Sequence, residues 1–550
     1  MAINPVSFTE KVIRNFLRYQ LTTYPFSDPD LYVQMKRLLS FDETRHTPLF
    51  KGPYVSLSKA FKEGASVDTM INERILHPHM RNLIPHPNLY GHQEKAIKAI
   101  KSGQTTLVST GTGSGKTECF LYPIISKCLE LRDKNKPEGI CAVLVYPMNA
   151  LAEDQLQRLR GLLAGTGITF GMYVGKTPER ESDVSGVRLS QGASREDYNQ
   201  QLKRVQKERR KEAVHPFEER CSREMMRKNG KQPRILLTNV KQLELLLTRG
   251  KDVELFDNAM LDFIVFDEAH TFKGAQGAET ACLVRRLRSF CGRGAAETVC
   301  IATSATIADP RKGGHAKGAE FASRFFGVNE KDVELVGEEH TPEVWSDNRT
   351  TPDEFPGNVS DHLKEILKYV DKEVETNPEL AKAFEDATGL KINPSRWRED
   401  LHNHLSRNEL VFQLSEILTR PRDLNDVLTE LKERVGRNVS EEEVLAWLAL
   451  GAASRKEDRP LLRPVIHGFI RGVGGAMVSF PEDQERLKLW LSCEGEVKDY
   501  LLPILTCTIC GQHYFEHYVA DLRYYGNELD GGEVYEGGRL WRTLAKANDG

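Results

Sequence analysis

Between residues 88 and 335, short runs of apolar residues alternate with longer segments whose apolar residues recur at helical spacing. The short runs are almost continuously apolar, which is typical of strands covered by helices on both faces. The alternation therefore predicts a doubly wound α/β domain with a parallel sheet. The predicted strands are residues 105–110, 141–147, 168–174, 234–239, 261–267 and 298–306.

The segments around this alternation follow other patterns. Residues 1–80 mix short helical patterns with turn signals, and we expect a small N-terminal helical domain before the α/β domain of residues 81–335. Residues 188–232 are charged and helix-prone, so they predict an insertion that interrupts the sheet.

Beyond the α/β domain, residues 336–457 predict a helical domain, and residues 458–550 become glycine-rich and strand-like. Ser440 and Glu443 have the spacing of a capping box before the apolar stretch VLAWLAL. The helical spacing is clearest in one run of apolar residues, which comprises Val359, Leu363, Ile366, Leu367 and Val370.

Composition narrows the class of protein. The formal net charge of −3 gives no global basic field, so a nucleic-acid partner would have to be met by local patches. The first residues lack the apolar core of a signal peptide, and no apolar run approaches the roughly 20 residues of a membrane span. Ten scattered cysteines are typical of a reducing compartment. We therefore expect a cytoplasmic protein with no membrane partner.

A glycine-rich loop follows the first predicted strand and opens a helix. Glycines allow backbone N–H groups to converge on phosphate oxygens, and the helix start adds its positive end. We expect Lys116 to reach the β and γ phosphates of ATP and Thr117 to ligate Mg²⁺. An ordinary glycine-rich turn is the alternative, which the order of strand, loop, Gly-Lys-Thr and helix disfavours. The expected cradle comprises Thr110, Gly111, Thr112, Gly113, Ser114, Gly115, Lys116 and Thr117.

Two later strands end in residues suited to phosphoryl transfer. One delivers Asp267 and Glu268 to the sheet edge where α/β proteins bind ligands. We expect Asp267 to hold Mg²⁺ and Glu268 to orient and deprotonate the attacking water. The next strand ends with Ser304 and Thr306, whose hydroxyls we expect to bond Asp267 or His270 and to sense the γ-phosphate.

With these motifs in this order, residues 88–330 resemble the superfamily 2 DExH helicases. The stretch DEAHTFKGAQGAE resembles a subgroup with the YprA-type helicases and the helicases of anti-phage systems such as Druantia and DISARM. The segments LFKGPYVSLSKAFKEGASVDTMI and LLRPVIHGFIRGVGG also fit that subgroup. The resemblance implies a RecA-like fold and a role in antiviral defence. It also implies that Gln93, in LYGHQEKAI, reads adenine, because an amide both donates and accepts hydrogen bonds.

The resemblance further implies contacts with the nucleic-acid backbone, with DNA as the substrate. This part of the resemblance rests on three segments, YPMNALAEDQLQRL, YVGKTPERE and LLTNVKQLELLL. Simple helix capping is the alternative role for Asn149 and Thr238, and Lys176 stands where the family commonly has an acidic residue. The implied contact residues are Asn149, Gln155, Gly175, Lys176, Thr177, Thr238 and Asn239.

The charged insertion is a second candidate for nucleic-acid contact. Residues 203–231 hold eleven Lys or Arg against five acidic residues. A solvated, salt-bridged surface is the default interpretation of such a run. The alternative is a nucleic-acid contact through Arg209, Arg210 and Lys211.

A second RecA-like lobe is expected in superfamily 2 motors, where its Gln-x-x-Gly-Arg motif completes the ATP site. No Gly-Arg pair in this chain stands in that context, and no second βα series follows residue 335. We therefore expect either a truncated protein or a partner chain that supplies the second lobe.

Cys507 and Cys510 form a Cys-x-x-Cys-Gly turn, with Cys493 upstream. Thiolates at this spacing suit one structural Zn²⁺. The fourth ligand is open between His513, His517 and a residue beyond the end. Two buried, reduced cysteines are the alternative.

These expectations converge on an ATP-dependent helicase or translocase. Two other interpretations stay open. One is an ATP-gated DNA-binding scaffold or sensor that does not separate strands, and the other is an RNA helicase.

Overall fold

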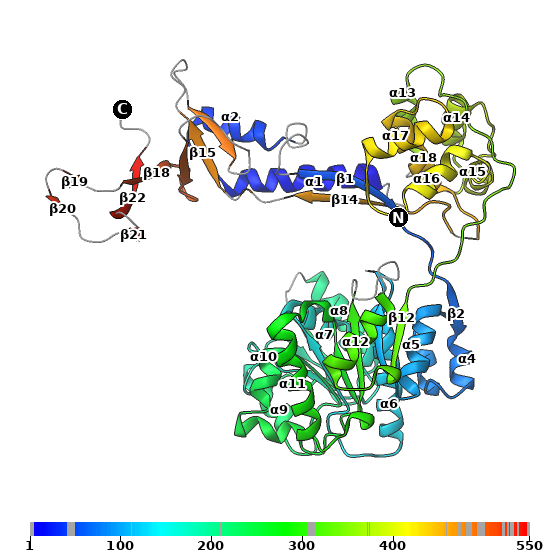
Figure 1. The fold of residues 1–550 in the computed structure, drawn as a ribbon. Coiled ribbons are helices and arrows are strands. Elements are labelled where there is room, and N and C mark those ends of the chain that lie inside the picture. Colours follow the sequence, from blue (N-terminus) through cyan, green and yellow to red (C-terminus); the bar gives the residue numbers. More distant parts are fainter. Residues whose placement is uncertain are drawn as a thin grey trace. The chain divides into compact units, whose positions relative to one another are not determined.

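A seven-stranded, fully parallel sheet is the centre of residues 60–341 in a computed structural model (Figure 1). It confirms the predicted α/β class and contains all six predicted strands. The seventh strand, at one edge, was not predicted. In spatial order the strands are β12 (Val333–Gly337), β4 (Thr105–Ser109), β11 (Val299–Ser304), β10 (Phe263–Phe266), β5 (Ala142–Tyr146), β9 (Ile235–Asn239) and β6 (Phe170–Met172).

The structure describes most of the 550 residues, with gaps. No described helix is long and apolar enough to span a bilayer. The described residues are 5–40, 50–111, 113–208, 212–304, 314–370, 372, 374–457, 459–470, 473, 475–479, 487–491, 501–519, 523–524, 527–528, 533–535 and 538–546.

Helices cover both faces of the sheet, and each face has its own apolar core. Ile264 and Val265 are neighbours on β10 but belong to different cores, because successive side chains of a strand point to opposite faces. Both are fully buried, as is every residue of the neighbouring strand β5. The covering helices are α5 (Gly91–Lys101), α6 (Lys116–Asp133), α7 (Asn149–Leu163), α10 (Val240–Leu246), α11 (Gly274–Phe290) and α12 (Gly314–Phe326).

The chain divides into two units, and their boundaries differ from those expected. Residues 60–341 form one unit, while residues 1–59 and 342–550 form the other. Residues 60–80, which we expected in an N-terminal domain, pack into the α6 side of the sheet through Val67, Met70 and Met80. Their elements are β2 (Glu63–Ser66), α4 (Val67–Asn72) and η1 (Pro78–Asn82), followed by β3 (Asn88–Tyr90).

The first 59 residues join the other unit because β1 (Phe50–Leu57) pairs antiparallel with β14 (Pro464–Ile470) and with β13 (Arg422–Asp423). Strand pairing between segments about 400 residues apart leaves no mark on local hydrophobic periodicity. The structure therefore puts the boundary near residue 60 instead of residue 80. The chain leaves the unit of residues 1–59 at residue 60 and returns to it at residue 342.

The charged insertion folds against α7. Tyr198, Val205 and Val214 form a small buried core with Ala164, just after the end of α7. Several of its described arginines form ion pairs, as in Arg220 with Glu138, which agrees with the default interpretation. Arg209, Arg210 and Lys211 lie outside the described residues. The elements here are η2 (Glu181–Asp183), β7 (Val187–Arg188), α8 (Arg195–Lys207), β8 (Val214–His215), α9 (Arg223–Arg227) and η3 (Gly250–Phe256).

In the second unit, a helical bundle occupies most of the segment predicted to be helical. Trp397 and Trp447 are fully buried at its centre, together with Ile366 and Val370 of the predicted apolar run. The helices are α13 (Val359–Val370), α14 (Pro378–Thr388), α15 (Trp397–Leu405), α16 (Glu409–Ile417), α17 (Leu424–Val435) and α18 (Glu441–Ala453).

The predicted strand-like character after residue 458 is also present. Strands β15 to β17 pack an apolar face against α1 (Pro5–Thr23) and α2 (Pro29–Leu38). Further strands follow to residue 546. The strands of this part of the chain, from first to last, are β15 (Ala476–Ser479), β16 (Lys488–Leu491), β17 (Leu502–Thr506), β18 (His513–Val519), β19 (Arg523–Tyr524), β20 (Asn527–Glu528), β21 (Glu533–Tyr535) and β22 (Gly538–Lys546).

Only half of the predicted capping box at α18 forms. The Ser440 hydroxyl accepts a hydrogen bond from the Glu443 N–H at 3.2 Å. The Glu443 carboxylate does not return to Ser440 but accepts from Arg437 at 2.6 and 3.0 Å and from Trp447 Nε1 at 3.1 Å. Glu443 is only 2% exposed, so its carboxylate is buried. Its contacts with Arg437 and Trp447 join the start of α18 to the bundle core.

We expect Glu443→Ala to lower the free energy of unfolding by about 3 kcal/mol, since it leaves the Arg437 guanidinium buried without its charge partner. Denaturant unfolding of the full chain would measure the loss. The exposed Glu441→Ala, in the same first turn, removes only a helix-end charge and should cost under about 1 kcal/mol. Equal losses of unfolding free energy in the two variants would show that the buried ion pair adds no more stability than an exposed charge in the same helix turn.

Candidate active site

The glycine-rich loop joins β4 to α6, as predicted. Gly113 and Gly115 have φ angles of 79° and 76°, in the left-handed region that favours glycine. At Gly115 a Cβ atom would also lie 2.4 Å from Gln93 Nε2. The backbone conformation therefore disfavours a side chain at position 115, and a Cβ atom there would also displace the Gln93 amide.

Hydrogen bonds brace the loop from within. The hydroxyls of Thr110 and Ser114 lie 2.7 Å apart, and Ser114 also donates to the Gly111 carbonyl at 2.9 Å. Thr110 and Ser114 are both buried. Thr112 lies outside the described residues. The half-buried Lys116 and Thr117 open α6 directly after this braced turn.

The first turn of α5 fastens the loop from outside. His92 Nε2 donates to the Ser114 carbonyl at 2.8 Å, and burial lowers the pKa of His92. Gln93 Nε2 donates to the Gly115 carbonyl at 3.2 Å, while its Oε1 accepts from the Tyr90 N–H at 2.9 Å. Both ends of the Gln93 amide are therefore engaged by the protein, and its contact with adenine stays a prediction.

The acidic strand end meets the loop. Lys116 Nζ lies 3.4 Å from Glu268 Oε1, although the two residues are 152 positions apart. The Lys116 side chain is 10% exposed and that of Glu268 is 27% exposed, so the pair is partly buried. The two predicted motifs thus meet at the carboxyl edge of the parallel sheet.

The charged form of the Asp267 carboxyl is electrostatically unfavourable at this site. Burial raises the pKa of Asp267, and the Thr303 hydrogen bond opposes that shift. The negative charge of Glu268 adds to the shift, and Lys116 opposes it. A buried carboxylate that lacks enough positive charge fits a bound divalent cation, whose charge would compensate it.

Glu268 has a left-handed backbone, with φ of 51° and ψ of 46°. This conformation is uncommon for a residue other than glycine and costs free energy. His270, in the short helix η4 (Ala269–Thr271), places Nδ1 3.3 Å from Glu268 Oε2. The strained turn therefore directs the Glu268 carboxylate between a lysine and a histidine.

The hydroxyl on Asp267 comes from a residue that the sequence analysis did not name. Thr303 donates to Asp267 Oδ1, whereas we expected Ser304 or Thr306 in this role. Thr306 lies outside the described residues, and the buried Ser304 uses its carbonyl to accept from Thr110 N at 3.2 Å. The parallel register, in which Phe266 lies opposite Ala302, puts Thr303 beside Asp267. Thr303 could have been found in the sequence by aligning the ends of the two predicted strands, 261–267 and 298–306.

The residues expected to contact nucleic acid gather where β5, β9 and β6 end side by side. Asn239 Nδ2 donates to Asn149 Oδ1 at 2.8 Å, which joins the starts of α10 and α7. Asn239 also caps α10 by accepting from Gln242 N, whereas Asn149 is not the capping residue of α7.

Three of these expected residues face the protein. The fully buried Thr238 donates to the Tyr173 carbonyl at 2.8 Å, and Thr177 donates to the Met172 carbonyl at 2.8 Å. The Oε1 atom of Gln155 is buried as well. Gly175 and Lys176 are exposed.

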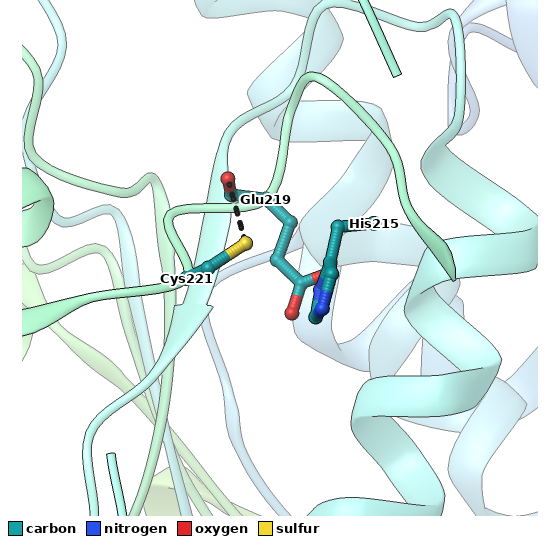
Figure 2. Close-up of side chains that lie close together, drawn as sticks. All are labelled: His215, Glu219 and Cys221. Atoms are coloured by element: carbon teal, nitrogen blue, oxygen red, sulfur yellow. Dashed lines mark hydrogen bonds and ion pairs between the residues drawn. The ribbon is translucent and has the colours of Figure 1, made fainter. Parts of the chain in front are cut away.

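A group of potential metal ligands lies at the base of the insertion. Atoms of His215, Glu219 and Cys221 lie within 4.8 Å of one another, and Figure 2 shows the imidazole beside the Glu219 carboxylate. Arg160 of α7, however, donates to both Glu219 oxygens at 2.7 Å. Burial opposes ionisation, yet His215 and Arg160 hold the pKa of Glu219 below its usual value.

The Cys221 thiol is equally unsuited to a metal. It donates to the Glu219 backbone carbonyl at 3.6 Å, and burial raises the pKa of Cys221 far above its usual value. A metal needs the thiolate and a free carboxylate. The cluster is therefore an ion-pair network that attaches the insertion to α7.

Cys507 and Cys510 lie on a tight turn in which the Gly511 N–H donates to the Cys507 carbonyl at 2.9 Å. Backbone N–H groups of Cys510 and Ile509 lower the pKa of Cys507. Gly511 has a φ of 76°, and a Cβ there would lie 2.8 Å from Ser27 N. Cys493 lies outside the described residues, so zinc stays a prediction.

This fold and pocket define a class: a RecA-like domain with a P-loop on one strand and an Asp-Glu pair two strands away. Residues 90–190 and 194–312 match the family described as DEAD/DEAH box helicase. The chain carries a superfamily 2 DEAD/DEAH-box helicase domain, which confirms the resemblance found in the sequence.

Curated relatives are longer than this chain. It is 26% identical to Druantia protein DruE of Escherichia coli (strain UMEA 4076-1), over 92% of this chain and 32% of DruE. It is 29% identical to the uncharacterized ATP-dependent helicase YprA of Bacillus subtilis (strain 168), over 41% of this chain and 24% of YprA. A crystal structure of the DUF1998 helicase MrfA bound to DNA aligns with a TM-score of 0.35 and 20% identity, over 65% of this chain and 44% of MrfA.

We expect Asp267→Asn to stabilise the nucleotide-free protein by about 1 kcal/mol at pH 7.5. The raised pKa of Asp267 means that the folded state favours its protonated form. The Asp267 carboxyl therefore makes its full contribution to the free energy of unfolding at pH values below its pKa in the unfolded chain. That contribution is lost as the pH rises through its pKa in the folded protein. The gain should shrink toward pH 4.

Unfolding by denaturant at both pH values, without Mg²⁺ or nucleotide, measures this gain. The exposed Asp257→Asn is the matched control and should change stability by under about 0.5 kcal/mol at either pH. A destabilised Asp267→Asn at pH 7.5 would contradict the expected strain.

Proposed function

We propose that this chain is the ATP-hydrolysing part of a nucleic-acid motor that acts on DNA in bacterial anti-phage defence. The contact of Lys116 with Glu268 at the sheet edge carries the proposal, because it brings the phosphate-binding and catalytic groups together at one partly buried site. The relative DruE, whose name assigns it to Druantia, supports the defence role.

Each group in the pocket has a defined task. Backbone N–H groups of the loop and Lys116 neutralise the phosphates. Thr117 and Asp267 would hold Mg²⁺, which supplies further charge neutralisation when bound. Glu268, aimed by its strained backbone and by His270, orients the attacking water and takes its proton.

DNA would lie along the ends of β5, β9 and β6, held through its phosphates. The paired Asn149 and Asn239, with exposed Gly175 and Lys176, supply polar groups on this path. Such contacts carry no base preference, as a translocating motor requires. The buried hydroxyls of Thr177 and Thr238 would position the turns rather than contact DNA.

A second RecA-like lobe would complete the ATP site with an arginine. Another part of the protein or a partner chain would supply that lobe, and the chain spans about a third of DruE. On this proposal, closure of two lobes on ATP and their reopening after hydrolysis move the strand. The 550-residue chain alone should therefore turn over ATP slowly.

Two variants test the catalytic assignment. Lys116→Ala should weaken ATP binding about 100-fold, because it removes the charge on the β and γ phosphates. Glu268→Gln should keep ATP binding but lower turnover about 100-fold or more, because it lacks the base. Calorimetry and DNA-stimulated phosphate release measure the two effects.

The exposed Lys134→Ala, at the far end of α6, and the exposed Glu279→Gln are the matched controls and should behave as wild type. Normal turnover by Glu268→Gln would reject the assigned base. DNA-stimulated hydrolysis without strand displacement, in an assembly with both lobes, would favour an ATP-gated scaffold. Stronger stimulation by RNA than by DNA would favour an RNA helicase.

We also propose a structural Zn²⁺ held by Cys493, Cys507 and Cys510. Cys507→Ser should lose the bound zinc, measured by mass spectrometry of the purified chain, because a ligand thiolate is missing. Cys221→Ala should keep it, since the His215 cluster is an ion-pair network. A zinc-free wild-type chain would contradict the proposal.

A further inference from the structure

A carboxylate from outside the helicase motifs touches the phosphate loop. The Gly111 N–H donates to Glu338 Oε2 at 3.0 Å. Glu338 directly follows β12, and Gly337 lies opposite Ser109 in the parallel register, so the strand pairing delivers it to the loop entrance. Its other oxygen, Oε1, lies 3.4 Å from His340 Nε2.

Glu338 directly precedes a short ribbon that forms both ends of the ATP-binding unit. This unit runs from Ala60 to Thr341, so residues 60–62 and 339–341, here called the crossing ribbon, carry its two covalent connections to the rest of the chain. Lys62 N donates to the Glu339 carbonyl at 2.8 Å, and Thr341 N donates to the Ala60 carbonyl at 2.9 Å.

Aromatic contacts join the same ribbon to the loop by a second route. The Phe61 ring stacks on His340 with centroids 5.4 Å apart and meets His92 at 5.4 Å. His92 in turn donates to the Ser114 carbonyl of the loop. Two independent paths, through Glu338 and through Phe61, thus connect the phosphate loop to the crossing ribbon.

An acceptor carboxylate on this loop competes with the ligand that the loop is shaped for. Converging backbone N–H groups bind anions, and the Glu338 carboxylate is the anion that contacts the Gly111 end of the loop. Triphosphate would bring several like charges close to Glu338 and repel it. Binding of nucleotide and contact by Glu338 therefore oppose each other, and the coupling is reciprocal.

We propose that Glu338 is a positioning residue that latches the empty phosphate loop and is displaced by nucleotide phosphates. Its release loosens the crossing ribbon, so that occupancy of the ATP site is transmitted to both connections of the unit. This inference rests on the proposed ATP binding. It adds a way in which the rest of the chain would respond to nucleotide in that site. Glu338 acts through the loop and takes no part in the chemistry.

Glu338→Gln tests the latch, because glutamine keeps an acceptor oxygen and loses the charge. Titration calorimetry of the full chain with Mg²⁺ and a non-hydrolysable ATP analogue should show binding about fivefold tighter than wild type. The gain should be smaller for ADP and absent for adenosine, since it depends on phosphate charge. A general structural effect would not follow this order.

Glu339→Gln is the matched control, because the neighbouring Glu339 pairs with Lys62 at 3.0 Å instead of with the loop. It should bind all three ligands as wild type does. Unchanged or weaker binding of the ATP analogue by Glu338→Gln, with wild-type binding intact, would overturn the latch alone. A wild-type chain that binds no nucleotide would overturn both the latch and the proposed function.

Hydrogen exchange tests the transmission. In wild type, the ATP analogue should speed exchange at the Lys62 and Thr341 amides, which bond across the ribbon. In Glu338→Gln these amides should exchange faster before nucleotide is added, with little further change after it. Identical ribbon exchange with and without nucleotide in wild type would overturn the inference.

Discussion

The contact between Lys116 and Glu268 is the constraint around which the ATP-binding unit is organised. It requires β4 and β10 to end at the same edge of the sheet, with β11 between them, so that a phosphate loop and a catalytic carboxylate meet. The buried apolar strands position these ends rigidly, because each strand is covered on both faces. The chemistry therefore depends on the sheet register more than on any single loop.

The pocket stores unfavourable free energy that a ligand would relieve. Asp267 is buried with a raised pKa, Glu268 has a left-handed backbone, and Glu338 occupies an N–H of an anion-binding loop. The first two features cost stability, and the contact of Glu338 would have to be given up to phosphate; all three are matched to phosphate or a divalent cation. Local strain of this kind is expected at functional sites.

Much of the ATP site could be predicted from the sequence, because its motifs are local. The described residues of the glycine-rich loop and the pair Asp267 and Glu268 lie at the strand ends where they were expected, as do six strands of the sheet. Thr303 was missed because its role depends on register between two strands, and β12 was missed because one short edge strand has little periodicity. The boundary near residue 80 failed because β1 pairs with β14 far along the chain.

The sequence by itself determined the class of fold, the phosphate loop and the acidic pair, since spacing along one segment specifies each of them. Tertiary structure alone decided which hydroxyl bonds Asp267, which hydroxyls near the proposed DNA path are buried, and that Glu338 reaches the loop. The physical reason is that hydrogen bonds and burial act between segments brought together by folding. Local patterns of residue type do not record such contacts.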